Sequence, residues 1–189
     1  MQTHHHWQDG LSFIKSLQLA ADARLSQVNF TDDQIWEVLF NDDKHAPLTL
    51  RTRYGGRVQR ATLTPHWVQG GRTIATPQTY NKVPRLVSFA PAFVRIEGHI
   101  TQNLHLTAEY WVMESASIGG HYTIHNTGTT TEEIRLDLVG DALTDKKSDL
   151  AIITLISQSH ALSLGRYPNI EPVVMLENAQ TSTYTGKTQ

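Results

Sequence analysis

The feature that most constrains the fold is a strict alternation of apolar and polar side chains in AEYWVMESASIGGHYTIHNTG, residues 108–128. Successive side chains of a strand point to opposite faces, so such a segment has one face for a core and one face outside it. A tight connection near MESAS folds the segment into a hairpin that sets Val112 opposite Ile118. The apolar face of this hairpin is therefore predicted to be core.

The polar face of the hairpin carries the sharpest candidate constellation in the chain. The same register sets Trp111 opposite Gly119 and Glu109 opposite His121. If the next strand continued the meander, it would bring Asp137 beside His121. Glu109, His121 and Asp137 are thus weak candidates for a metal site. Opposite charges also stabilise ordinary sheet surfaces, and we favour that interpretation, so no metal and no cofactor are predicted.

Short runs rich in Val, Ile, Thr, Leu and aromatic residues follow one another from about residue 30 onward, separated by Gly, Pro, Asn and Asp. Many short strands without helices between them indicate an antiparallel sandwich or barrel. The expected strands are 34–40, 47–54, 58–64, 85–89, 92–100, 103–112, 117–126, 132–140, 151–157, 160–164 and 172–177. Segments 68–85 and 140–150 are predicted to be surface loops, and loops on a rigid scaffold often carry function.

The N-terminal part has a different pattern. Apolar residues recur at three- and four-residue spacing within 8–27, which predicts one amphipathic helix; they are Leu11, Ile14, Leu17, Ala21 and Leu25. The expected organisation is therefore a helix and linker over 1–29, a β-sandwich domain over 30–178, and a polar tail over 179–189.

Composition excludes several classes of protein. The chain has no cysteine, which rules out disulfide scaffolds, thiol catalysis and cysteine-bound zinc. A formal net charge of -2 argues against a nucleic-acid partner. No run of about 18 apolar residues is present, so no membrane partner is expected. The first residues lack the pattern of a secretory signal, and we expect a cytoplasmic protein.

Aromatic side chains are the remaining candidates for ligand contact. Trp67, Tyr80 and Trp111 could stack on sugar rings, and Trp67 stands at the lip of the predicted loop 68–85. An aromatic residue on a sandwich strand is more often part of the core. No G-x-S-x-G, H-E-x-x-H or phosphate-binding loop occurs, so no catalytic residue is predicted.

Several of these segments together are similar to a known arrangement. The runs QIWEVLF, PLTLRTRYGGRVQRATLTP and LVSFAPAFVRIEGHI precede an EYW strand at Glu109–Trp111, an NTG turn at Asn126–Gly128 and an alternating strand at Ile134–Leu138. This order resembles the N-terminal β-sandwich (supersandwich, galactose-mutarotase-like) domain that stands before an (α/α)6 barrel in bacterial glycoside hydrolases and phosphorylases. The resemblance covers roughly residues 30–178, and its motifs are of moderate specificity.

The resemblance implies a function without catalysis in this chain, because the catalytic carboxylates of such enzymes lie in the helical barrel. The chain would be a non-catalytic domain of a carbohydrate-active enzyme that packs on the barrel and shapes its cleft for an oligo- or polysaccharide. Two alternatives stay open. One is a free-standing carbohydrate-binding or protein-interaction module, and the other is an independent metal-dependent enzyme.

Overall fold

The computed structural model describes residues 14–19, 36–40, 46–52, 60–114, 117–143, 154–156, 161–163 and 173–175. These residues contain strands and turns and no helix, and they include no helix long and apolar enough to cross a membrane. The strands are β1 (Ser16–Leu19), β2 (Trp36–Leu39), β3 (Thr49–Thr52), β4 (Arg60–Gln69), β5 (Arg72–Ile74), β6 (Lys82–Ala90), β7 (Phe93–His99), β8 (Leu104–Glu114), β9 (Ser117–Asn126), β10 (Arg135–Leu143), β11 (Thr154–Ile156), β12 (Ala161–Ser163) and β13 (Val173–Met175).

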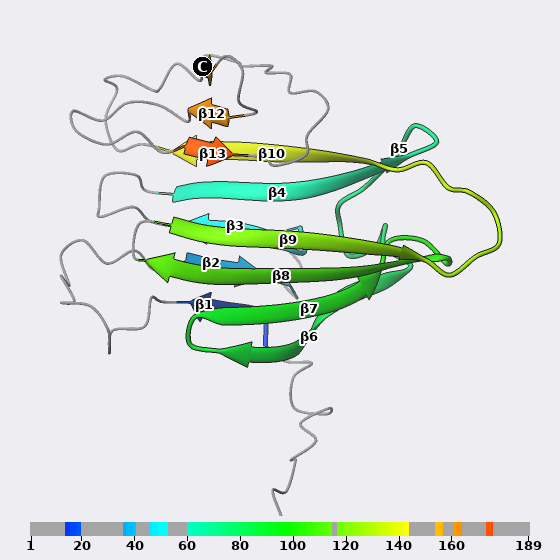
Figure 1. Ribbon diagram of the computed structural model, residues 1–189, viewed down its shortest axis with the longest axis horizontal. Coiled ribbons are helices and arrows are strands. Elements are labelled where there is room, and N and C mark those ends of the chain that lie inside the picture. The colour runs from blue at the N-terminus through cyan, green and yellow to red at the C-terminus, as the bar shows by residue number, and fades with distance from the viewer. Residues whose placement is uncertain are drawn as a thin grey trace, which may run out of the picture.

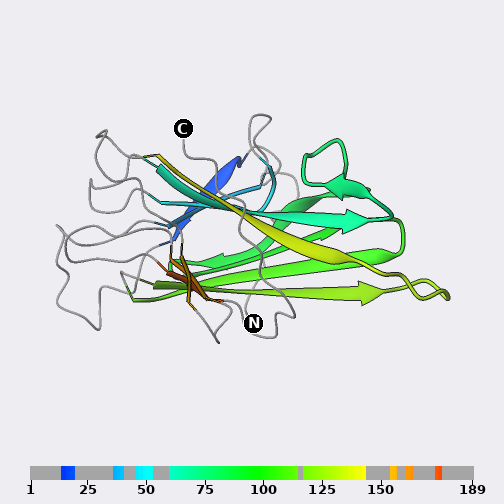
Figure 2. The same ribbon diagram turned by 90° about the horizontal axis from the view of Figure 1, so that it is seen from above.

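Two antiparallel sheets face each other, which confirms the predicted all-β, sandwich-like architecture (Figures 1 and 2). The first sheet has the order β1-β2-β3-β4-β10, with β5 paired to β4. The second sheet has the order β6-β7-β8-β9. A small third sheet consists of β11, β12 and β13.

The hydrophobic core lies between the two main sheets. In β7 and β8 every second side chain is buried, including Val94, Ile96, Leu106 and Tyr110. The register of β8 against β9 is the predicted one, with Val112 opposite Ile118, Trp111 opposite Gly119 and Glu109 opposite His121. Period-two alternation therefore directs the apolar side chains of these strands into one shared core.

The predicted meander ends after β9. Strand β10 joins the first sheet, where it pairs with β4 along its whole length and Asp137 lies opposite His66. The connection over 127–134 carries the chain from one sheet to the other instead of forming a tight turn. The Thr127 amide donates to the Asn103 carbonyl at 2.8 Å, which fixes the start of this connection. Alternation specifies a buried face but not the neighbouring strand, and for this reason the third strand was assigned to the wrong sheet.

The predicted helix over 8–27 is contradicted where the structure describes it. Ser16–Leu19 forms β1, which pairs with β2 at the edge of the first sheet. Leu17 and Leu19, two residues apart, face the core, and Leu19 is completely buried. Strand pairing satisfies main-chain groups of β2 that a helix would leave without partners. The rest of the predicted helix, apart from the irregular residues 14 and 15, and the tail 179–189 lie outside the described residues.

The predicted loop 68–85 is largely regular. Strand β4 continues to Gln69, and a two-residue turn leads directly into β5. Gly70 and Gly71 have φ angles of 55° and 78°, which is the left-handed pair that a tight type I′ hairpin needs. Only a short irregular stretch then precedes β6. Of the predicted loop 140–150, residues 140–143 belong to β10 and the remainder lies outside the described residues.

Candidate functional site

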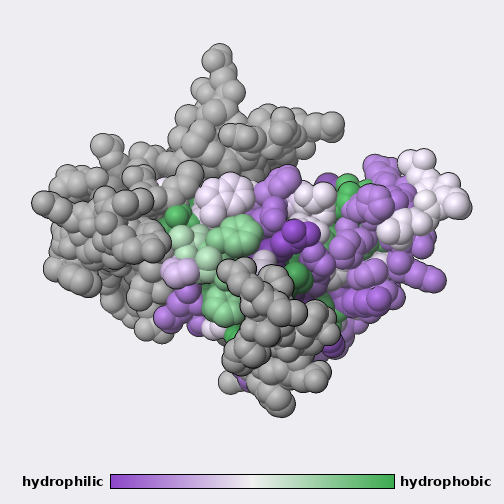
Figure 3. All heavy atoms as spheres, turned by 60° about the horizontal axis from the view of Figure 1, so that its bottom comes forward, coloured by the Kyte–Doolittle hydropathy of each residue, from purple (hydrophilic) through white to green (hydrophobic). Residues whose placement is uncertain are grey.

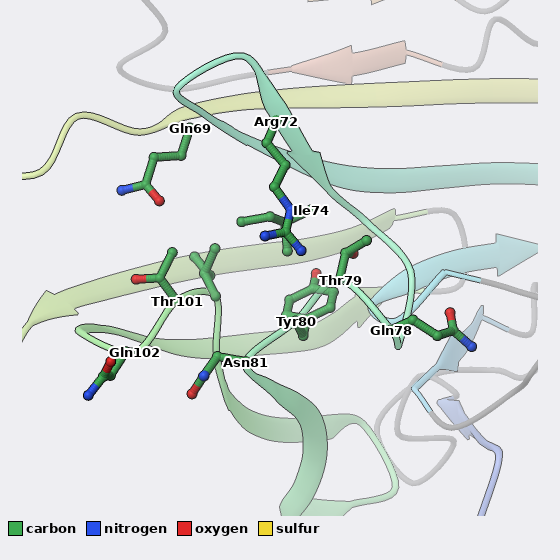
Figure 4. A pocket seen from close by; sticks show the side chains of 10 residues that line it. Gln69, Arg72, Ile74, Gln78, Thr79, Tyr80, Asn81, Thr101 and Gln102 are labelled. Atoms are coloured by element: carbon green, nitrogen blue, oxygen red, sulfur yellow. The ribbon is translucent and has the colours of Figure 1, made fainter.

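An open pocket of about 380 Å³ lies at one end of the sandwich. The β4–β5 hairpin contributes Gln69, Arg72 and Ile74, the turn before β6 contributes residues 78–81, and the turn after β7 contributes residues 100–102. Figure 4 shows these three segments around the pocket. A cavity of this volume falls within the range of small-molecule sites.

Local hydrogen bonds hold the walls of the pocket. The Thr79 hydroxyl accepts hydrogen bonds from the Ala75 and Thr76 amides, both at 3.0 Å, and donates one to the Thr76 carbonyl at 2.7 Å. The Asn81 amide donates to the Ile100 carbonyl at 3.3 Å, which ties the two turns together. The pocket is thus built from short connections on a rigid scaffold rather than from a long loop.

The floor of the pocket is apolar and its walls are polar. Ile74, Tyr80 and Ile100 are nearly completely buried and present only small surfaces to the opening. The Tyr80 hydroxyl accepts a hydrogen bond from Trp67 Nε1 at 3.0 Å. Burial raises the pKa of Tyr80 well above its ordinary value, so this hydroxyl stays protonated at neutral pH and is no general base.

Among the described residues that line the pocket, Arg72 is the one that carries a charge. Its side chain reaches from the hairpin to a place beside Ile74 and near Tyr80, whereas Gln78 lies at the opposite rim from Gln69 (Figure 4). No carboxylate among the described residues forms an ion pair with Arg72. Its guanidinium therefore stays available to donate to hydroxyl or carboxylate oxygens of a ligand.

Glu132 lies in the connection over 127–134 between the two sheets, and its side chain is hydrogen-bonded to the wall of the pocket. Its carboxylate accepts hydrogen bonds from Gln69 Nε2 and Asn103 Nδ2, both at 2.8 Å, and a longer one from the Thr101 hydroxyl at 3.4 Å. These donors, led by Asn103, lower the pKa of Glu132. The carboxylate is accordingly ionised at neutral pH, and it positions Gln69 and Thr101.

The three predicted sugar-stacking aromatics occupy three different environments. Trp67 is 1% exposed and lies in the core, the more common place for an aromatic residue on a sandwich strand, so its ring offers no exposed platform for a sugar. Its ring instead packs edge-on against the ring of Tyr122, with 5.4 Å between the two centroids. Tyr80 lies on the pocket floor with little of its ring accessible. Trp111 is 36% exposed, but it stands at the opposite end of β8 from the turn that lines the pocket, so these residues do not form one site.

The row proposed for a metal is only partly assembled. Glu109 and His121 are cross-strand neighbours, with 4.0 Å between Oε2 and Nδ1. Asp137 lies in the other sheet and accepts two hydrogen bonds from Arg135, at 2.8 and 2.9 Å. The expected three-residue row is therefore wrong. Across the described ranges, no three His, Asp or Glu side chains are grouped so as to hold a metal ion.

The sequence predicts that segment 68–85 is a loop of the kind that carries function, but it does not indicate which polar residues line the pocket. Arg72 and Gln69 flank the Gly70–Gly71 turn, and this glycine pair was the available signal for a hairpin that presents both side chains. Thr101 and Gln102 follow a strand without any distinctive motif. In comparisons with known protein families, curated proteins and solved structures, no match to this chain was found.

Proposed function

We propose that this chain is a non-catalytic β-sandwich domain of a carbohydrate-active enzyme, and that its polar pocket supplies contacts to a sugar. The chemistry of the pocket carries this proposal. Amide and guanidinium groups of Gln69, Arg72 and Gln102 surround a floor that includes Tyr80. Sugars present hydroxyl groups at their edges, which match these polar donors.

The test is a titration of ¹⁵N-labelled chain with neutral oligosaccharides, maltoheptaose and cellopentaose, followed by amide chemical shifts. We expect shifts at the hairpin and turn residues Gly70, Gly71, Thr79 and Thr101. Arg72→Ala should weaken binding at least about tenfold, because a charge-assisted hydrogen bond contributes about 1.5–3 kcal/mol. The matched control Gln18→Ala changes an exposed residue of β1, and it should bind like the parent. Shifts confined to other surfaces would contradict the proposal.

A second observation supports a packing partner, such as the helical barrel, over a free-standing module. Val87, Phe89 and Trp111 on the second sheet are 50%, 57% and 36% exposed. Seen from the β6–β7 side, apolar side chains gather toward one end of the surface and hydrophilic ones toward the other (Figure 3). Val87 and Phe89 belong to the edge strand β6, and large exposed apolar side chains at a sheet edge offer a surface on which a partner can pack.

The size of the native polypeptide separates these two versions of the proposal. An antibody raised against this chain should detect, in the source cell, a band several times heavier than 21.2 kDa if the domain is joined to a barrel. A band at 21.2 kDa would overturn the barrel-linked version and favour a free-standing carbohydrate-binding or protein-interaction module.

A further inference from the structure

Three histidines form one cross-strand row on the outer face of the second sheet. His99 on β7 lies opposite His105 on β8, and His105 lies opposite His125 on β9. The rings of His99 and His105 are in direct contact, with centroids 5.0 Å apart and planes inclined at 60°. Both side chains are partly exposed, so an ion from solvent can reach them.

One carboxylate lies near this histidine pair. His105 Nε2 stands 3.9 Å from Glu97 Oε2, which is longer than a hydrogen bond but close enough for attraction between charges. The Glu97 carboxylate therefore favours a cation bound at the neighbouring imidazole.

Some charges near His99 and His105 oppose a bound cation, and others favour it. Lys82 on the edge strand β6 lies opposite His99 and opposes a cation, whereas Glu97 supplies a negative charge beside His105. Arg95 is bound to Glu97 at 2.8 Å and offsets part of that charge.

We propose that His99 and His105 form a two-imidazole chelate for a divalent transition-metal ion of the class that includes Ni²⁺ and Cu²⁺. Imidazole nitrogen is a preferred ligand for these ions, and water completes the coordination. The pair is proposed rather than a three-residue centre because only His99 and His105 have their rings in contact. This site is separate from the sugar pocket and does not depend on the function proposed for it.

The test is calorimetric titration of the full chain with Ni²⁺. His4, His5 and His6 could bind the ion themselves, so all measurements use a background in which these three are replaced by alanine. In that background, His99→Ala and His105→Ala should each lower the affinity for Ni²⁺ about tenfold or more. The matched control is His121→Ala, which removes an exposed histidine from the same sheet face.

Two outcomes would overturn the proposal. One is parent-like affinity in His105→Ala, and the other is an equal loss in His121→Ala, with the fold of each variant confirmed by circular dichroism. Lys82→Ala should change the affinity for Ni²⁺ in the opposite direction, because it removes the positive charge opposite His99. It should tighten Ni²⁺ binding about twofold, in line with the strength of exposed charge pairs. Weaker Ni²⁺ binding in Lys82→Ala would contradict the assignment.

Discussion

At the scale of single residues, two tryptophans differ sharply in how they contribute to the fold. Trp67 is buried between the sheets, donates a hydrogen bond to Tyr80 and packs against Tyr122. Trp111 lies on the outer face and covers Gly119. A Cβ atom at position 119 would stand 2.6 Å from the indole ring, so the glycine is what allows this close approach.

These surroundings predict unequal costs of truncation. Trp67→Ala should lower the free energy of unfolding by about 3–5 kcal/mol, the usual range for removing a buried aromatic side chain. Trp111→Ala should cost about 1–2 kcal/mol, because the ring is partly exposed and removing it leaves no enclosed cavity. Urea denaturation of both variants measures the difference. Equal losses would show that Trp111 is buried by a contact other than Gly119.

At the scale of elements, β1 is the part of the fold that differs most from the expectation. Leu17 packs against the core and Leu19 is completely buried, whereas Gln18 between them is exposed. Ser16 also donates a hydrogen bond to Glu37 on β2 at 2.6 Å, and Glu37 in turn binds Arg51 of β3. These hydrogen bonds link side chains of three neighbouring strands at the edge of the first sheet.

A pair of substitutions in β1 tests its strand geometry. Leu19→Ala should lower the free energy of unfolding by about 2–5 kcal/mol, because it empties a buried site. Gln18→Ala, one position away, should change it by less than about 0.5 kcal/mol, because the side chain is exposed. Chemical denaturation of the two variants is sufficient. A small loss in Leu19→Ala would mean that β1 does not pack on the core.

At the scale of the whole molecule, buried tyrosines join the two sheets. The Tyr110 hydroxyl, on β8, is hydrogen-bonded to the Leu48 carbonyl at 3.1 Å and to the Tyr122 hydroxyl at 2.7 Å. Burial raises the pKa of Tyr122 to about 12 and that of Tyr110 well above its ordinary value. Neither phenol can ionise easily while the sheets remain packed together.

The raised pKa values predict that stability is lost in alkali. Unfolded tyrosine has a pKa of about 10, so the contribution of these groups is fully present below pH 10. It is lost as the pH rises from about 10 toward the folded value of about 12 for Tyr122. Each such tyrosine should make the free energy of unfolding fall more steeply with pH, by up to about 1.4 kcal/mol per pH unit. Thermal unfolding between pH 8 and pH 12 measures it, and Tyr122→Phe should show a shallower decline. An unchanged slope in that variant would contradict the assignment.

The β8–β9 hairpin and its register follow from local alternation in the amino-acid sequence. Alternation from Ala108 to Ile124 and a short connection are local properties, and a slip by one residue would move every apolar side chain to the wrong face. The predicted pairs Val112 with Ile118 and Glu109 with His121 followed from that periodicity alone. The all-β class was predictable for the same reason, because many short alternating runs favour strands.

Which strands become neighbours across long separations depends on the packing of the whole fold. Strand β10 joins β4 because the first sheet had an edge with free main-chain groups, and no local pattern distinguishes that edge from the edge of β9. The same pairing separates Asp137 from His121, so the three weak metal candidates do not form one row. Burial of Trp67 and assembly of the pocket around Arg72 likewise depend on segments brought together by the packing of the two sheets. Hydrogen-bond pairing and core filling are properties of the whole fold, whereas periodicity reports only which face of each strand is buried.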